Sequence, residues 1–304
     1  MDYLNKINDL YPIRKTEEEK ADFINYIKEE VKKYDKQAEV ELLDNKHKNI
    51  VIGDIKKAKV ILTAHYDTPA TSLIPNLIMP RNPILAFLYA FSFPIVIALI
   101  SVLLTYGISY LLGLQYIVWA VMFLIVYFAF FFLATRAFKN KHNKNDNTSG
   151  VAGIMNILSK CSSENVCYVL FDNEEKGLLG SRSFNKKYKD ILSTKLVINL
   201  DCIGNGKNII VISSKEAKNH QLHSLLEESL ISNESYNVKY FGSCGSTCNS
   251  DHKNFVNGIG IVACHKIKVI GYITPRIHTN KDTVAETENI DYISNGIIKF
   301  IDKI

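Results

Sequence analysis

One long uncharged block constrains the fold of this chain more than any other feature. From Asn82 to Thr135, 54 consecutive residues include no Asp, Glu, Lys or Arg and are rich in Phe, Leu, Ile and Val. A helix that spans a bilayer needs about 20 apolar residues, so the block can hold two spans. We predict them at about 84–112 and 116–135, with Gly113 and Gln115 at the bend. The alternative, a buried core helix, suits a much shorter apolar run.

The charges that flank this block predict the orientation of the two spans. Basic residues lie on both sides of the block, and none lies at the bend. Loops rich in Lys and Arg stay in the cytoplasm, so we expect a cell-membrane protein with two spans and its remaining residues on the cytoplasmic side. These cations account in part for the net charge of +5, which requires no nucleic-acid partner. The flanking basic residues are Arg81, Arg136, Lys139, Lys141 and Lys144.

Outside the block, apolar strands alternate with amphipathic helices. Such alternation is typical of an α/β fold with a mixed, mostly parallel sheet flanked by helices. We therefore expect one discontinuous domain, residues 1–80 and 137–304, with residues 81–136 inserted as a two-helix transmembrane hairpin. Strands are predicted at 38–43, 49–54, 59–67, 167–172, 195–201, 207–213 and 260–268, and helices at 17–34, 150–160, 178–189, 216–231, 252–257 and 289–303.

Side chains that can bind a metal follow the ends of several predicted strands. Open α/β sheets bind ligands beyond the carboxyl ends of their strands, so these side chains should lie near one another. Any one of them alone has an ordinary explanation, since Asp often caps helices and His is often a hydrogen-bonded polar group. Together they predict a site, and they are His65, Asp67, Asp146, the stretch 172–175, Asp201 and His278.

The spacing of these residues has a physical meaning. His65 and Asp67 are two positions apart and face the same side of an extended chain, so Asp67 can accept a hydrogen bond from the far ring nitrogen of His65. Glu174 and Glu175 are adjacent and tend to diverge, so one can reach a metal and the other a water. Nitrogen and carboxylate ligands without cysteine favour zinc, with cobalt or manganese as substitutes.

Five motifs in this order resemble a known superfamily, the co-catalytic di-zinc exopeptidases. The motifs are AHYDTP, NDNTSGVAG, FDNEEKGLLGS, NLDCIG and HTNKDT. Bacterial leucine aminopeptidases, glutamate carboxypeptidase, glutaminyl cyclases and the inactive transferrin receptor belong to it. The resemblance covers the chain except the uncharged block. It implies the zinc exopeptidase fold and two zinc ions per chain.

The resemblance also implies a role for each residue. Asp146 would bridge both zinc ions, His65 and Asp201 would complete one site, and Glu175 and His278 the other. Glu174 would be the general base that activates a shared water for peptide hydrolysis, and Asp67 the partner of His65 behind the metal. The segment SDHKNF (250–255) resembles a family segment that lines the substrate cleft. Within it Asp251 and His252 receive no role, and we expect Ser250 to cap the short helix.

These observations predict a membrane-anchored zinc aminopeptidase that acts on peptides. A carboxypeptidase or a glutaminyl cyclase is the alternative with the same fold, and an inactive membrane-bound binding protein is the alternative of another class. A transport role for the hairpin is disfavoured because its spans hold no acid or base. We also expect the site to lie near the membrane, where it could trim peptides at the bilayer, although the hairpin could equally be an anchor and nothing more. Residue preference, oligomeric state and physiological substrate stay open.

Overall fold

A ten-stranded mixed sheet lies at the centre of the computed structural model, which describes residues 2–304. The strand order is β1-β2-β7-β3-β8-β11-β12-β5, and β9 joins β10 to the edge of β11. The central strands β7, β3, β8 and β11 are parallel to one another, whereas β1, β2 and β12 pair antiparallel with their neighbours. Strand β9 is antiparallel to β11 and parallel to β10. This confirms the predicted α/β class. The strands are β1 (Ala38–Leu43), β2 (His47–Ile52), β3 (Val60–His65), β5 (Asn76–Ile78), β7 (Val166–Phe171), β8 (Leu196–Leu200), β9 (Asn208–Ser213), β10 (Asn237–Gly242), β11 (Gly258–Ile267) and β12 (Gly271–Ile277).

Helices cover both faces of this sheet, because its central strands are apolar on both sides. In β3, Val60 and Leu62 join the larger core beneath α1, α2, α5, α8 and α9, while Ile61 joins the core beneath α6. Side chains of a strand alternate between its two faces, so a continuous apolar run such as this one needs cover on each side. The helices are α1 (Tyr3–Leu10), α2 (Glu17–Lys32), α5 (Gly150–Lys160), α6 (Leu179–Leu192), α7 (Lys215–Lys218), α8 (His223–Ser229) and α9 (Thr287–Ile301).

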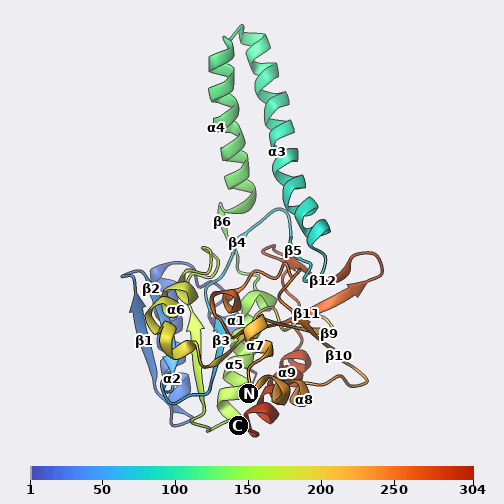
Figure 1. The fold of residues 1–304 in the computed structure, drawn as a ribbon. Coiled ribbons are helices and arrows are strands. Elements are labelled where there is room, and N and C mark those ends of the chain that lie inside the picture. The colour runs from blue at the N-terminus through green and yellow to red at the C-terminus, as the bar shows by residue number, and fades with distance from the viewer. Residues whose placement is uncertain (1) are drawn as a thin grey trace.

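The uncharged block forms a helical hairpin that projects from the sheet domain (Figure 1). Helix α3 (Pro83–Leu112) ends at Gly113, which has the positive φ of 62° that glycine tolerates, and α4 (Tyr116–Thr135) returns. Both helices are long and apolar enough to cross a membrane. The segments that flank the hairpin are joined to each other, because the short strands β4 (Ala70–Thr71) and β6 (Phe138–Lys139) pair.

The prediction of one helix at 216–231 was wrong. The segment forms two short helices, α7 and α8, separated by a turn. At that turn the ring nitrogen Nδ1 of His220 accepts a hydrogen bond from the backbone N–H of Leu222, at 3.2 Å. A side chain that bonds to nearby backbone competes with the helical hydrogen bond, so the helix breaks here. Helix α1 and strands β10 and β12 were not predicted.

Candidate metal centre

Three parallel strands bring the first candidate side chains to one edge of the sheet. His65 is the last residue of β3, and it lies beside Phe171, the last residue of β7, in the strand register. The segment that follows β7 supplies Glu174 and Glu175, and the residue after β8 is Asp201. The carboxyl ends of these neighbouring strands therefore place residues from distant parts of the sequence together.

Asp146 lies between two groups of these side chains. One carboxylate oxygen is 3.3 Å from Nε2 of His65, and the other is 3.0 Å from Nε2 of His278. His65 Nε2 is also 3.8 Å from an Asp201 oxygen, and His278 Nε2 is 3.3 Å from an oxygen of Glu175. Ligand atoms of His65, Asp146 and Asp201 lie within 4.8 Å of one another, as do those of Asp146, Glu175 and His278. Asp146 belongs to both groups.

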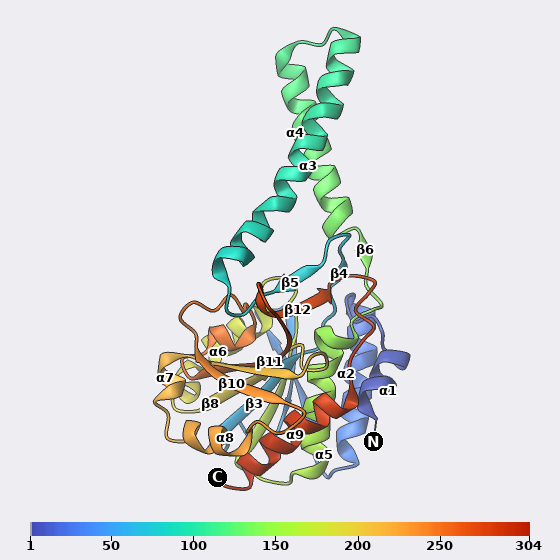
Figure 2. The ribbon, with the colours of Figure 1, turned by 90° about the vertical axis from the view of Figure 1, so that its right-hand side faces the viewer.

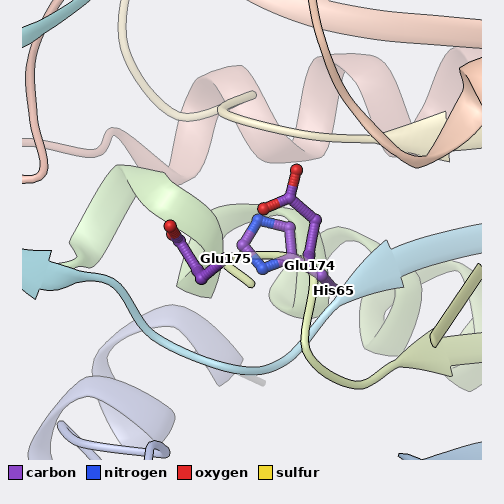
Figure 3. Close-up of side chains that lie close together, drawn as sticks. All are labelled: His65, Glu174 and Glu175. Carbon is purple, nitrogen blue, oxygen red and sulfur yellow. The ribbon is translucent and has the colours of Figure 1, made fainter. Parts of the chain in front are cut away.

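The two adjacent glutamates diverge at a sharp turn after β7. Figure 3 shows their carboxyl groups on either side of the His65 ring. Both of their backbone N–H groups donate to the carboxylate of Asp67, at 3.0 Å for Glu174 and 3.2 Å for Glu175. The turn needs Asn173 at a positive φ of 55°, which Asn adopts more readily than most residues. Asp67 therefore fixes the direction in which this pair leaves the backbone.

Asp67 also lies behind His65, although its closer contact is not the expected one. Nδ1 of His65 is 3.1 Å from the backbone carbonyl oxygen of Asp67 and 3.6 Å from its carboxylate. Either oxygen can accept a hydrogen bond from the N–H group at Nδ1, a tautomer that leaves Nε2 free to bind a metal. The carboxylate is mainly engaged by the glutamate turn.

Asp146 is positioned by a residue to which the sequence assigned no role. The backbone N–H groups of Asn145 and Asp146 donate to the two carboxylate oxygens of Asp282, at 3.1 and 3.0 Å. The loop is also tied to β8, because Asn147 donates to the carbonyl oxygen of Leu200 at 2.9 Å. The Asp146–Asn147 peptide bond is cis. Asp282 lies in the motif HTNKDT, but nothing local to that motif indicates its distant partner.

The small residues after Asp146 let α5 begin close to the sheet. A Cβ atom on Gly150 would lie 2.3 Å from the carbonyl oxygen of Leu200. No side chain fits there, so the helix can approach the end of β8 only with glycine at this position.

The expectation that Ser250 caps a helix was wrong. Its side chain makes no capping hydrogen bond to the short 3₁₀ helix Asp251–Asn254. The hydroxyl instead donates to Asp201 at 2.5 Å and accepts from the side-chain amide of Asn199 at 2.8 Å. The serine oxygen thus accepts from Asn199 where a cap would accept from a backbone N–H, and its charge-assisted hydrogen bond orients Asp201.

Asp251 and His252, which follow Ser250, are both buried beside the centre. Asp251 accepts a hydrogen bond from Ser181 at 2.5 Å, and burial raises its pKa to about 7. Burial lowers the pKa of His252 to about 4. Neither residue belongs to the two groups that Asp146 links.

The first acidic residue after β7, Asp172, points away from the candidate centre. Its carboxylate forms a buried ion pair with Lys20 of α2, with Nζ and oxygen 2.5 Å apart. Its other oxygen accepts from the backbone N–H of Lys48. Asp172 therefore attaches α2 and β2 to the end of β7 and takes no part in the metal-competent groups.

The centre concentrates negative charge away from water. Burial raises the pKa of Glu174 and of Glu175, and a neighbouring carboxylate raises each further. Burial alone would lower the pKa of His65 and His278, yet the surrounding carboxylates hold both pKa values well above 6.5. Protons on the two imidazoles can balance part of this charge, and a bound cation is the other physical means of balancing it.

Two buried oxygens in the centre fit ligands for such a cation. Oε1 of Glu175 and Oδ1 of Asp201 have no hydrogen-bond partner among residues 2–304. A buried carboxylate oxygen without a partner carries a large cost, which metal coordination removes. Imidazole nitrogen and carboxylate oxygen are also the donors that zinc accepts without cysteine.

Comparisons with solved structures identify the fold. An aminopeptidase of Legionella pneumophila, LapA, matches with a TM-score of 0.59 and 16% identity, covering 98% of this chain and 69% of that one. The glutaminyl cyclase of Porphyromonas gingivalis gives a TM-score of 0.57 and 14% identity, and the match covers 99% of this chain and 95% of that one. BSAP, a zinc aminopeptidase from Bacillus subtilis, gives a TM-score of 0.50 and 15% identity, and the match covers 84% of this chain and 49% of that one.

The sequence itself matches a peptidase family. No curated protein sequence matches the chain significantly. The family named Peptidase family M28 matches residues 139–301, which is more than half of the chain. With the aminopeptidase and glutaminyl cyclase folds among the similar structures, this confirms the resemblance to the co-catalytic exopeptidases. The chain belongs to peptidase family M28.

Proposed function

We propose that this protein is a membrane-anchored zinc aminopeptidase that removes N-terminal residues from peptides. The observation that carries the proposal is the position of Asp146, whose two oxygens lie 3.3 Å from His65 and 3.0 Å from His278. One carboxylate between two sets of nitrogen and oxygen donors is the arrangement that two neighbouring metal ions require.

The donor atoms divide into two zinc sites that share Asp146. His65 and Asp201 would hold the first ion, and Glu175 and His278 the second. The unpartnered oxygens of Asp201 and Glu175 support this division, because each site then uses one of them. Zinc bound to these residues would act as a Lewis acid, polarising the scissile carbonyl and lowering the pKa of a water towards about 7.

Glu174 is the general base in this proposal. It lines the same cleft as Asp146, Asp201 and His278. Its carboxylate lies within 4.8 Å of ligand atoms of His65 and Glu175, beside the two groups that Asp146 links and outside both of them. Burial raises its pKa well above the ordinary value, and a carboxylate with a raised pKa both accepts and returns a proton readily near neutral pH. Glu174 would take a proton from the attacking water and pass it to the leaving amine.

Asp67 supports this proton transfer by positioning the residues around it. It holds the backbone of Glu174 and Glu175 and lies next to Nδ1 of His65. Its carboxylate therefore sets the direction of the base, and its backbone carbonyl oxygen is the closer partner of the ligand His65, so Asp67 is a positioning residue.

The hairpin, residues 81–136, is the membrane anchor in this proposal, and residues 1–80 and 137–304 form the peptidase domain. The exposed surface of α3 and α4 is made of large apolar side chains, which supports contact with lipid. The basic residues at both ends of the hairpin support a cytoplasmic domain.

The test uses full-length protein in detergent and a panel of aminoacyl anilides, with and without a chelator. We expect hydrolysis that stops when zinc is removed and returns when zinc is added. Substrates with a blocked amine separate an aminopeptidase from a carboxypeptidase, and a peptide with N-terminal glutamine reveals cyclase activity through loss of ammonia. Zinc content without turnover on any substrate would favour an inactive binding protein.

A further inference from the structure

A cavity of about 770 Å³ runs from the candidate metal centre to the base of the hairpin. At one end it is lined by Glu175 and His278. At the other end it is lined by side chains of both hairpin helices, which are Ala86, Tyr89, Ala90 and Phe93 of α3 and Phe131 and Thr135 of α4. Cavities of this size commonly hold a ligand, so the site and the hairpin share one binding space.

The two helices are apart where they meet this cavity. Figure 2 shows α3 and α4 close together along most of their length and separated at the base, above β4 and β5. The rings of Phe93 and Phe131 lie with their centroids 6.2 Å apart, and both line the cavity. The cavity therefore lies between the helices at their domain ends, where a hairpin in a bilayer would meet the membrane surface.

Helix α3 also lines the cleft of the metal centre. Ala86, in the first turns of α3, lines this cavity and also the neighbouring cleft that contains Asp146, Glu174 and Asp201. The segment before α3 is bonded to the centre as well, because the backbone N–H of Ser72 donates to the carbonyl oxygen of His278 at 2.6 Å. If the hairpin were only an anchor, its first turns would not need to line the site.

The charges in the cavity separate its polar and apolar parts. Lys15, Lys176 and Arg136 line it together with Glu175, and the hairpin part beyond them contributes mainly Ala and aromatic side chains. Cations in this position disfavour a basic peptide segment and accept neutral or acidic ones. The apolar part is completed by Ile74, Pro75 and Leu77.

We propose that the substrates are peptides with a hydrophobic segment, and that this segment lies between the bases of α3 and α4 while the N-terminus lies at the metal centre. The inference rests on the proposed aminopeptidase function and adds the substrate class to it. Such peptides partition into the bilayer, and the opening between the helices lets them reach the site from the membrane without crossing water.

The test compares two peptides of equal length and identical N-terminal residues, one continuing with Leu and Ala and the other with Ser and Gln. Full-length protein in lipid nanodiscs should cleave the apolar peptide with a kcat/KM at least ~10-fold higher, as expected for burying one or two large apolar side chains. A short aminoacyl anilide, which cannot reach the hairpin, serves as the measure of the basal reaction.

Two matched substitutions separate the cavity from simple partitioning into lipid. Ala90→Trp fills the hairpin end of the cavity, whereas Ala129→Trp adds the same side chain to an exposed position of α4 that does not line it. We expect Ala90→Trp to remove the preference for the apolar peptide, with each peptide rate taken relative to anilide cleavage by the same variant. Ala129→Trp should leave both the preference for the apolar peptide and anilide cleavage as they are in the unmodified protein.

The outcomes distinguish this inference from the proposed function. Equal cleavage of both peptides, or an apolar preference that Ala90→Trp leaves intact, overturns the inference while anilide cleavage still supports the aminopeptidase. Absence of anilide cleavage in the unmodified protein overturns the aminopeptidase itself. Anilide cleavage by each variant also shows that the variant has folded.

Discussion

The sheet domain and the hairpin follow opposite rules for which side chains are buried. In the domain, Ile, Val and Leu fill the interior, and β3 and β7 are buried throughout. In the hairpin, the buried residues of α3 include Ser101, Thr105 and Ser109, while Leu103 and Leu111 are 74% and 81% exposed. Small residues thus lie between the helices, and large apolar residues lie outside.

This difference is the one expected if the sheet domain lies in water and the hairpin lies in a membrane, as proposed. Water drives apolar side chains inward, whereas hydrocarbon gives no such drive, and helices in it pack through small residues that let their backbones approach. The centre and the hairpin nevertheless meet at one cavity. The comparison therefore predicts that chemistry resides in the domain, that lipid contact resides in the hairpin, and that each can be disturbed separately.

The largest expected effect concerns chemistry and leaves the hairpin untouched. Glu174→Gln keeps the shape of the side chain and removes the base, so kcat for an aminoacyl anilide should fall by about 10²–10⁴-fold. Zinc content, measured by elemental analysis, should stay as in the unmodified protein. Glu18→Gln, an exposed position of α2, is the control and should have no effect. A Glu174→Gln protein with ordinary turnover would show that another group is the base.

A second change separates metal binding from chemistry within the domain. Asp146→Asn removes the charge shared by the two donor groups, so zinc affinity should fall by more than the roughly 10–100-fold typical of losing a supporting residue. Asp282→Asn, which only weakens the support of the Asp146 loop, should cost less. Elemental analysis after dialysis measures both. Full zinc occupancy in the Asp146 variant would rule out its bridging position.

A third change tests the hairpin alone. Leu103→Lys places a charge on the exposed face of α3, where insertion into a bilayer should cost about 2.5–3.5 kcal/mol. The fraction of protein that stays in membranes after alkaline washing should drop. Val269→Lys puts the same charge on an exposed residue of the domain and should leave that fraction unchanged. Equal membrane retention of both variants would contradict contact between α3 and lipid.

The smallest effect concerns pH, and only the domain should respond. Burial lowers the pKa of His252 from 6.5 to about 4. Between these two pH values His252 therefore binds a proton in the unfolded chain and not in the folded one. The free energy of unfolding should therefore fall by about 2 kcal/mol between pH 7 and pH 5 through this residue. Residues 82–135 contain no Asp, Glu, His, Cys, Lys or Arg, so the hairpin adds nothing to this dependence.

Urea unfolding in detergent at the two pH values measures this effect. In His252→Gln the loss of stability on acidification should be smaller by that amount. His142→Gln, at a half-exposed position, should keep the full pH dependence of the unmodified protein. Identical pH dependence in all three proteins would mean that His252 is protonated in the folded state.

Several features of this molecule follow from local sequence. The absence of charge from Asn82 to Thr135 is enough to predict two long apolar helices, because an uncharged block of this length matches two membrane spans. The apolar runs before His65, Glu174 and Asp201 suffice to predict three buried strands, since short apolar runs bounded by polar residues favour strands over the longer helices. A shared strand edge then brings their terminal residues together.

Only the tertiary structure decided which distant groups support that edge. Asp282 holds the loop of Asp146, Ser250 donates to Asp201, and Lys20 draws Asp172 away from the centre. Each of these is a hydrogen bond or ion pair between residues far apart in the chain, and such a bond leaves no periodic trace in the sequence. The cavity that joins the centre to α3 and α4 is also of this kind, because its walls come from seven separate stretches, within 15–20, 67–77, 86–93, 131–136, 175–176, and at Thr247 and His278, that meet only in the folded chain.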